Sequence, residues 1–124
     1  MDDPHHKSLL IGVVGPCGSG KSTLIMGLVK AGFTGRHIAQ EHSYVPYMWK
    51  RITDPDLLIY LNASFETCTE RRHLNWTIDD YKEQLRRLEH AYVNADLIIE
   101  TDHRSAAEVL GTLLNFLESK GSKA

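Results

Sequence analysis

The chain has 124 residues, enough for one domain with its own core and too few for a second. Its 14 Lys and Arg residues against 16 Asp and Glu residues leave no cationic excess for a phosphate backbone or an acidic membrane surface, so we expect no general nucleic-acid binding. Two separate cysteines, Cys17 and Cys68, a polar N-terminus and the lack of an apolar run approaching ~20 residues predict a reduced, cytoplasmic protein that does not cross a membrane.

The first predicted element is a buried strand over Leu9–Val14, a continuously apolar run. It leads into a match to the pattern G-x-x-x-x-G-K-[ST], and a helix is predicted over Thr23–Lys30. In this strand, loop and helix setting the glycines allow a tight turn that directs N–H groups inward, which forms an anion-binding nest at the helix N-terminus. The residues predicted to bind phosphate are Gly15, Pro16, Cys17, Gly18, Ser19, Gly20, Lys21, Ser22 and Thr23.

Two side chains of this loop have chemical roles in the prediction. The Lys21 ammonium can reach the β- and γ-phosphates of a nucleotide, and the Ser22 hydroxyl can take one position on a Mg²⁺ ion. Cys17 lies among N–H dipoles that favour a thiolate, although a slot for a small side chain is the simpler interpretation. The loop therefore predicts a nucleoside triphosphate, with ATP and Mg²⁺ as ligands.

The middle of the chain reads as short elements separated by turns. We expect a left-handed helix cap at Gly32, followed by a connection over Phe33–Arg36 and a short strand over His37–His42. A short helix is predicted within Tyr44–Ile52, with Pro46 in its first turn. A turn over Thr53–Asp56 then leads into a strand over Leu57–Leu61. The three aromatic residues in Tyr44–Trp49 either form an accessible acceptor pocket or contact surface, or cover the core.

The second half alternates in the same way. We expect a helix capped by Ser64 that runs to Arg72 or His73, a helix from a capping box at Thr77, a strand over Ala95–Glu100 and a helix from Ser105 to Gly121. The apolar stripe of the longest helix is predicted to face the core, and its members are Ile78, Tyr81, Leu85, Leu88 and Tyr92.

Strands that alternate with helices predict an α/β fold, a three-layer sandwich with a mainly parallel four-stranded sheet. We expect residues 8–119 to form a single domain, with a flexible N-terminal extension over residues 1–7 and a flexible tail over residues 120–124. In such sheets ligands bind at the carboxyl ends of the strands. The residues that follow each predicted strand are therefore the candidates for chemistry.

Two stretches give the chain a resemblance to a known family. Gly15–Thr23 and Pro55–Arg72 resemble the P-loop small-molecule and nucleotide kinases, the group that includes shikimate, adenylate and thymidylate kinases. Ala95–Asp102 is similar to the last strand of those enzymes. The resemblance implies a P-loop NTPase fold in a minimal form, in which Arg71 and Arg72 open a lid and the loop carrying Asp102 and Arg104 lies against the adenine.

The chain also departs from that family. The segment between Ala31 and Asp56 is too short for the usual acceptor domain, and the lid is reduced to Arg71–Trp76. Glu41 is the one acid placed after an apolar-leaning segment near the loop, where it can hold the Mg²⁺ shell or act as a base; a surface glutamate is the alternative.

The residues of the lid and of the loop before the last helix each have two possible roles. Arg71 and Arg72 can neutralise charge on a transferred phosphoryl group, or can be helix-dipole partners. Trp76 can stack on a base or act as a capping hydrophobe, and Asp102 with Arg104 can line a base pocket or lead into the last helix.

Three interpretations of function stay open. The first is an ATP-dependent kinase that acts on an unknown small-molecule or nucleotide acceptor. The second is a nucleotide-binding regulatory module or slow NTPase that acts on a protein partner, and the third is a homo-oligomer in which a neighbouring copy completes the site.

The seven histidines show no spacing typical of a structural metal site.

Overall fold

The computed structural model describes residues 9–121 and contains one four-stranded, all-parallel sheet. Its strands lie in the spatial order β2-β1-β3-β4. Their bounds are Leu10–Val14 for β1, Thr34–His37 for β2, Leu57–Asn62 for β3 and Leu97–Glu100 for β4. The prediction of an α/β fold with a parallel four-stranded sheet is therefore confirmed.

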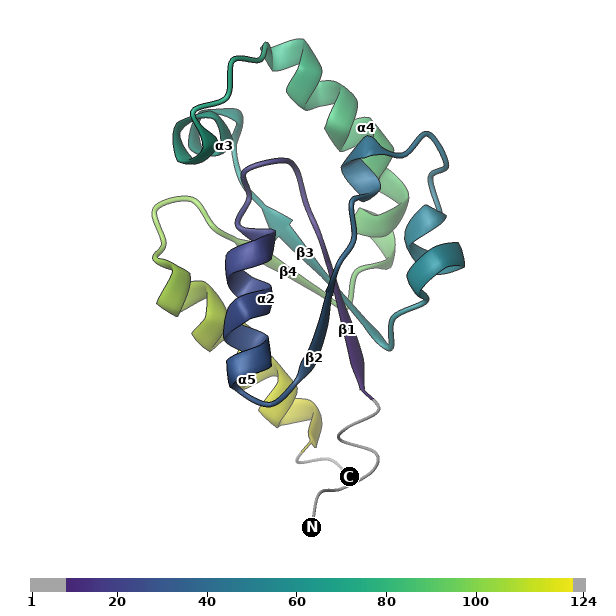
Figure 1. The fold of residues 1–124 in the computed structure, drawn as a ribbon, viewed down its shortest axis with the longest axis vertical. Helices are drawn as coiled ribbons and strands as arrows, with labels where there is room; N and C mark the ends of the chain where they lie inside the picture. The colour runs from purple at the N-terminus through teal and green to yellow at the C-terminus, as the bar shows by residue number, and fades with distance from the viewer. Residues whose placement is uncertain (1–8, 122–124) are drawn as a thin grey trace.

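Helices cover both faces of the sheet, which is compatible with a three-layer sandwich (Figure 1). On one face lie α2 (Lys21–Lys30) and α5 (Ala106–Gly121), which contact each other. On the other face α4 (Ile78–Asn94) packs over β3 and over a 3₁₀ turn, η1 (Gln40–His42). A short helix, α3 (Phe65–Arg72), follows β3 at the carboxyl end of the sheet.

Alternation along the strands divides the core into two clusters. Buried side chains toward α2 and α5 are Ile11, Val13, Leu24, Leu28, Leu57, Ile59, Leu61, Ile99, Val109, Leu113 and Leu117. Those toward α4 are Val14, Ile38, Trp49, Leu58, Tyr60, Leu88 and Ala91. Because β1 and β3 are central strands covered on both faces, they are apolar at nearly every position.

The predicted caps are present. At the end of α2, Gly32 has a φ of 93°, the Phe33 N–H donates to the Leu28 carbonyl and the Gly32 N–H to the Val29 carbonyl, the pattern of a Schellman motif. Ser64 accepts from the Thr67 N–H at the start of α3. Reciprocal capping boxes begin α4 at Thr77 with Asp80 and α5 at Ser105 with Glu108.

The predicted strand over His37–His42 is wrong. The strand is Thr34–His37, so three of its four residues lie in the stretch expected to be a connection and it ends where the predicted strand begins. It pairs with β1 from Leu10 opposite Thr34 to Val13 opposite His37. Only Ile38 of the apolar-leaning stretch enters the core. Beyond it the buried Gln40 side chain accepts from the Trp49 N–H and donates to the Val45 carbonyl, which fixes a 3₁₀ turn instead of a strand.

Three smaller predictions also need correction. The helix expected within Tyr44–Ile52 is a π-helical turn, η2 (Trp49–Thr53), with Pro46 in the turn that precedes it. The stripe of α4 is only partly core, because Ile78 and Tyr92 are about half exposed. The tail expected from residue 120 begins too early, since α5 reaches Gly121; residues 1–7 and 122–124 lie outside the described residues.

Candidate functional site

The glycine-rich loop, Gly15–Thr23, connects β1 to α2 at the carboxyl end of the sheet. It turns sharply, with the Ser19 N–H donating to the Pro16 carbonyl at 3.0 Å, and the first helical bond runs from the Leu24 N–H to the Gly20 carbonyl. The N–H groups of Lys21, Ser22 and Thr23 precede that bond, and no described residue accepts from them. The positive end of the α2 dipole is therefore open to a ligand.

The loop is held from behind by α3 and α4. Gly18 has a φ of 89°, and a Cβ built there would lie 2.6 Å from the Cys68 carbonyl oxygen, so only glycine allows this close approach. The Cys17 N–H donates to Gln84 Oε1 on α4 at 2.9 Å. These contacts fix the loop backbone from two sides before any ligand binds.

A cavity of about 490 Å³ opens at this end of the sheet. Its lining includes residues Cys17 to Leu24, while Gly15 and Pro16 are not among the lining residues. The other lining residues are His37, Ala39, Glu41, His42, Arg71, Arg72, Arg104, Ala106 and Val109. Residues from four separate parts of the chain meet here, among them most of the predicted site residues.

Lys21 is buried and fully engaged by the protein. Its ammonium donates to the carbonyls of Gly15 at 2.8 Å and Pro16 at 3.1 Å, and lies 3.0 Å from Glu41 Oε2. An ammonium has three donors, so all of them have protein acceptors. A phosphate can reach this ammonium only by replacing one or more of these acceptors.

Glu41 stands at the cavity on the η1 turn, not at a strand end, and its side chain is only 3% exposed. The alternative of a surface glutamate is therefore wrong. Arg87 of α4 donates to the Glu41 carbonyl, and the neighbouring Gln40 holds the same turn to residues 45 and 49. Oε1 of Glu41 is buried and has no hydrogen-bond partner among the described residues. A buried carboxylate oxygen without a partner is costly, and either a water molecule or a ligand group in the cavity would offset that cost.

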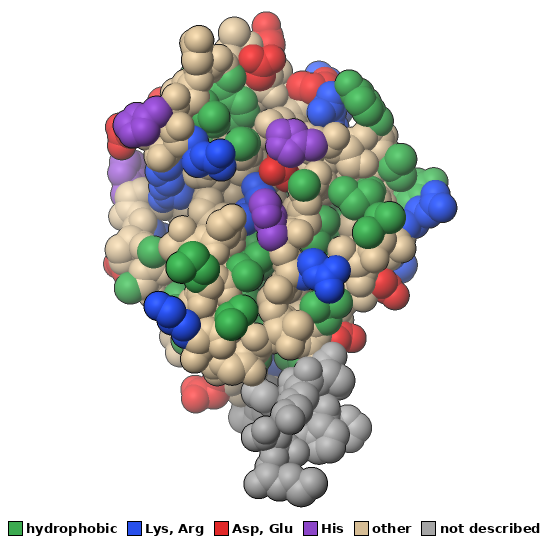
Figure 2. All heavy atoms as spheres, viewed as in Figure 1, with side chains coloured by type: hydrophobic (Ala, Val, Ile, Leu, Met, Phe, Trp, Pro, Cys, Tyr) green, Lys and Arg blue, Asp and Glu red, His purple; other side chains and the backbone are tan. Residues whose placement is uncertain are grey.

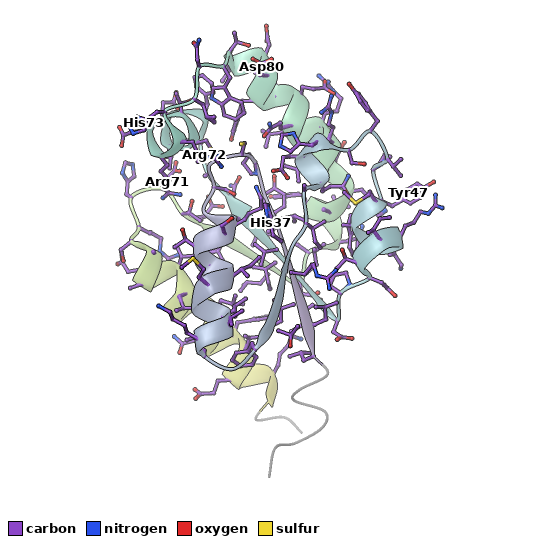
Figure 3. The ribbon with its side chains drawn as sticks, in the orientation of Figure 1. His37, Tyr47, Arg71, Arg72, His73 and Asp80 are labelled. Atoms are coloured by element: carbon purple, nitrogen blue, oxygen red, sulfur yellow. The ribbon has the colours of Figure 1, made fainter. Side chains whose placement is uncertain are left out.

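The two arginines of the lid have different surroundings. Arg71 donates to the Ser19 carbonyl at 3.2 Å, to the Thr101 hydroxyl at 3.1 Å and to the Thr101 carbonyl at 2.6 Å. It therefore ties the glycine-rich loop to the end of β4. Arg72 also lines the cavity, is exposed, and forms no hydrogen bond or ion pair with the described residues. Figure 3 shows both arginines on the α3 side of the site.

The residues of the β4–α5 loop also differ. Asp102 is not among the lining residues; it accepts from the Ser64 N–H at 3.0 Å and so joins this loop to the start of α3. Burial acts to raise the pKa of Asp102, but the hydrogen bonds from Ser64 and Thr67 outweigh it and hold the pKa below its ordinary value. Arg104 does line the cavity, and it donates to the Glu100 carbonyl and the Thr112 hydroxyl.

Two histidines are brought to the cavity that the sequence analysis did not assign to it. His37 ends β2 and His42 lies on η1, with its Nε2 3.7 Å from Glu41 Oε2. Partial desolvation at the cavity wall, followed by the charge of Lys21, lowers the pKa of His37 below its ordinary value. The carboxyl end of β2 was the signal that could have found His37, but the strand was predicted to begin there instead of ending there.

Two oxygen donors that line the cavity are of the chemical type that Mg²⁺ uses. The Ser22 hydroxyl lines the cavity without a described hydrogen-bond partner, and the unpartnered Glu41 Oε1 is close to Lys21. Mg²⁺ commonly uses one or two protein oxygens and takes the rest from phosphates and water. Within residues 9–121 no group of three or more His, Cys, Asp or Glu side chains could hold a metal by itself.

The aromatic residues of the reduced lid and of Tyr44–Trp49 lie away from the cavity. Trp76 donates to the Thr69 hydroxyl and stacks on Phe65, which corresponds to the capping alternative. Trp49 is buried and donates to His90 Nδ1 at 3.0 Å, so it covers the core. Tyr44 is 84% exposed, and Tyr47 is half exposed. The segment is thus core at one position and accessible surface at others.

The comparisons with known proteins assign no family. No helix in the described part of the chain has the length and apolar character needed to cross a membrane. No protein-family model matches the chain, and no curated protein matches it.

Proposed function

We propose that this chain is an ATP-binding P-loop protein of the kinase-like type, which transfers the γ-phosphoryl group to a small-molecule or nucleotide acceptor. The observation that carries the proposal is the start of α2, where three N–H groups without described partners and the Lys21 ammonium meet at one cavity. Oriented N–H groups and a lysine are the recurring elements that hold the phosphates of a nucleotide.

The charges around the cavity support the orientation of the nucleotide. Arg72 and Arg104 stand on the side of α3 and α5, together with the apolar Leu24, Ala106 and Val109. Phosphates on the loop would place a base against these apolar side chains. Arg72, which has no described partner, is then free to approach the phosphoryl group, while Arg71 positions the loop.

In the proposed reaction an acceptor hydroxyl forms a bond to the γ-phosphorus while the bond to the β,γ-bridging oxygen breaks. Lys21 exchanges its carbonyl and carboxylate contacts for phosphate oxygens, and the α2 N–H groups stabilise the negative charge. Glu41 Oε1, which has no described partner, accepts the hydrogen bond of the attacking hydroxyl. Mg²⁺, held by Ser22 and Glu41, would neutralise phosphate charge when bound.

A second candidate function is a regulatory nucleotide-binding module that acts on a protein partner. Four large apolar side chains within nine residues favour it, because they remain exposed beside the turn that carries Glu41: Tyr44, Val45, Tyr47 and Ile52. A stimulation of ATP hydrolysis by a protein, with no small-molecule acceptor, would favour this candidate over the kinase.

Calorimetry with ATP and Mg²⁺ tests the proposed function. We expect Lys21→Ala to weaken ATP binding by roughly 10- to 100-fold, because one or two charge-assisted hydrogen bonds are lost. The same variant should have no turnover. Lys30→Ala, at the exposed end of the same helix, is the matched control and should bind like the parent. Circular dichroism confirms that each variant is folded at the temperature used. Equal affinity of Lys21→Ala and the parent would refute the proposal.

A further inference from the structure

The two ends of the cavity differ in charge. The α3 and α5 side carries the guanidinium groups of Arg71, Arg72 and Arg104, whereas the lining residues of the β2–η1 side are His37, Ala39, Glu41 and His42. Figure 2 shows two histidine side chains beside a small acidic and basic patch at the centre of this face, with Lys and Arg side chains on both sides of it. Figure 3 places His37 on the β2 side, opposite Arg71 and Arg72.

No permanently charged cation other than Lys21 lines the β2–η1 side within the described residues. Arg36, the basic residue of β2, is not among the lining residues, and Arg87 is held behind η1 by the Glu41 carbonyl and by Glu83. An anionic acceptor would need fixed cations at this end to offset the desolvation of its charge. The described residues do not provide them.

Nucleotide binding removes the positive charge of Lys21 from this end of the cavity. In the structure the Glu41 carboxylate is neutralised by the Lys21 ammonium at 3.0 Å. Once phosphates draw that ammonium away, the positive charges of Lys21 and of a bound Mg²⁺ are taken up by the phosphates and the Glu41 carboxylate, so neither is left to offset the charge of an acceptor anion. An acceptor carboxylate or phosphate would then lack a cationic partner at this end, whereas a neutral acceptor needs none.

The same groups suit hydroxyls well. Glu41 Oε1 is a buried acceptor without a described partner, and the imidazole ring of His37, which lines the same end, offers two further hydrogen-bonding nitrogens. His42 adds a second ring within 3.7 Å of the carboxylate. Several hydrogen-bonding groups around one small space favour a ligand with several hydroxyls.

We propose that the β2–η1 end of the cavity binds an uncharged polyhydroxyl acceptor of the sugar or sugar-alcohol type and excludes its anionic counterparts. This proposal rests on the proposed kinase function. One acceptor hydroxyl donates to Glu41 Oε1 and attacks the γ-phosphorus; its proton passes to the carboxylate or through it to bulk water, and the nucleoside diphosphate leaves with the bridging oxygen.

Matched pairs of acceptors test the proposal. Release of ADP is measured with ATP and Mg²⁺ in the presence of glycerol or glycerol 3-phosphate, ribose or ribose 5-phosphate, and glucose or gluconate. We expect at least one neutral member to accelerate ADP release tenfold or more, and its anionic counterpart to have no effect. A stronger response to an anionic member, or no response to any neutral one, overturns the proposal. ATP binding by calorimetry separates these results from a failure of the proposed nucleotide site.

A binding measurement and a charge substitution make the test independent of turnover. In the presence of a non-hydrolysable ATP analogue, the neutral compound should shift the imidazole proton resonances of His37 and His42, but not those of His73, which is outside the lining residues. His42→Lys adds a fixed cation at this end and should shift the preference at least tenfold toward the anionic member of the pair. His73→Lys is the control and should leave the preference unchanged. Unmoved resonances, or an unmoved preference in His42→Lys, would contradict the charge argument.

Discussion

Replacement of Lys21 by methionine probes the buried ion pair of the site. Lys21 and Glu41 are only 5% and 3% exposed and lie 3.0 Å apart, so solvent screens their interaction little. Methionine keeps an unbranched apolar side chain but removes the charge, which leaves the Glu41 carboxylate buried without its partner. Breaking a buried pair in this way costs about 3–5 kcal/mol of the free energy of unfolding. For a chain of this length the melting temperature should fall by roughly 10–20 °C.

The measurement is urea unfolding followed by the fluorescence of Trp49 and Trp76. The double variant Lys21→Met/Glu41→Gln removes both charges, and we expect it to be no less stable than Lys21→Met alone, with a coupling energy of about 2 kcal/mol. Glu83→Gln is the matched control, because Glu83 is 39% exposed and pairs with Arg87 at the surface, so its loss should cost less than about 1 kcal/mol.

This prediction has a clear contrary result. A loss below 1 kcal/mol in Lys21→Met, or strictly additive effects in the double variant, would show that the two side chains do not depend on each other. The exchange of partners that we propose for Lys21 on nucleotide binding would then lose its basis.

Three other perturbations are directed at separate parts of the molecule. Glu41→Gln should leave the ATP affinity within a few-fold of the parent but lower turnover about 100-fold. The reason is that the carboxylate interacts with the acceptor hydroxyl or the metal and not with the nucleotide. Undiminished turnover in a steady-state assay would contradict this role. Trp49 is buried, so Trp49→Ala should lower the free energy of unfolding by about 3–5 kcal/mol. Tyr47 is half exposed, so Tyr47→Ala should lower it by less than about 1 kcal/mol. Equal losses in urea titrations would contradict this difference in burial. Since the pKa of Asp102 is lowered in the folded state, its contribution to stability is present above about pH 4 and is lost as the pH falls through the folded pKa. Asp102→Asn should therefore flatten the acid side of the stability profile, and an unchanged profile would argue against the Ser64 contact.

Local signals in the sequence were sufficient to predict the central strands and the starts of the helices. The apolar runs of β1 and β3 predict buried parallel strands, and the capping residues Ser64, Thr77 and Ser105 mark where helices begin. These signals work because they depend on hydrogen bonds and burial within a few residues of each other. The candidate loop Gly15–Thr23 could be found for the same reason, since its pattern is contiguous.

The position of β2 could not be found locally. Thr34–His37 carries exposed side chains and a glycine, so nothing in its composition indicates a strand; it forms one because its backbone completes the hydrogen bonds of β1. The stretch with a more apolar appearance is instead turned by Gln40, whose partners at residues 45 and 49 are set by tertiary packing.

The sequence by itself determined which residue types are available to a phosphate site, and the tertiary structure decided what each one does. Arg71 and Arg72 are adjacent and chemically identical, yet Arg71 is bound to Ser19 and Thr101 while Arg72 has no described partner. Asp102 was a candidate for the base pocket but holds the Ser64 N–H, and His37 joins the cavity because β2 ends there. These roles depend on contacts between residues far apart in the chain, and the free energy of such contacts depends on burial and geometry that no local pattern specifies.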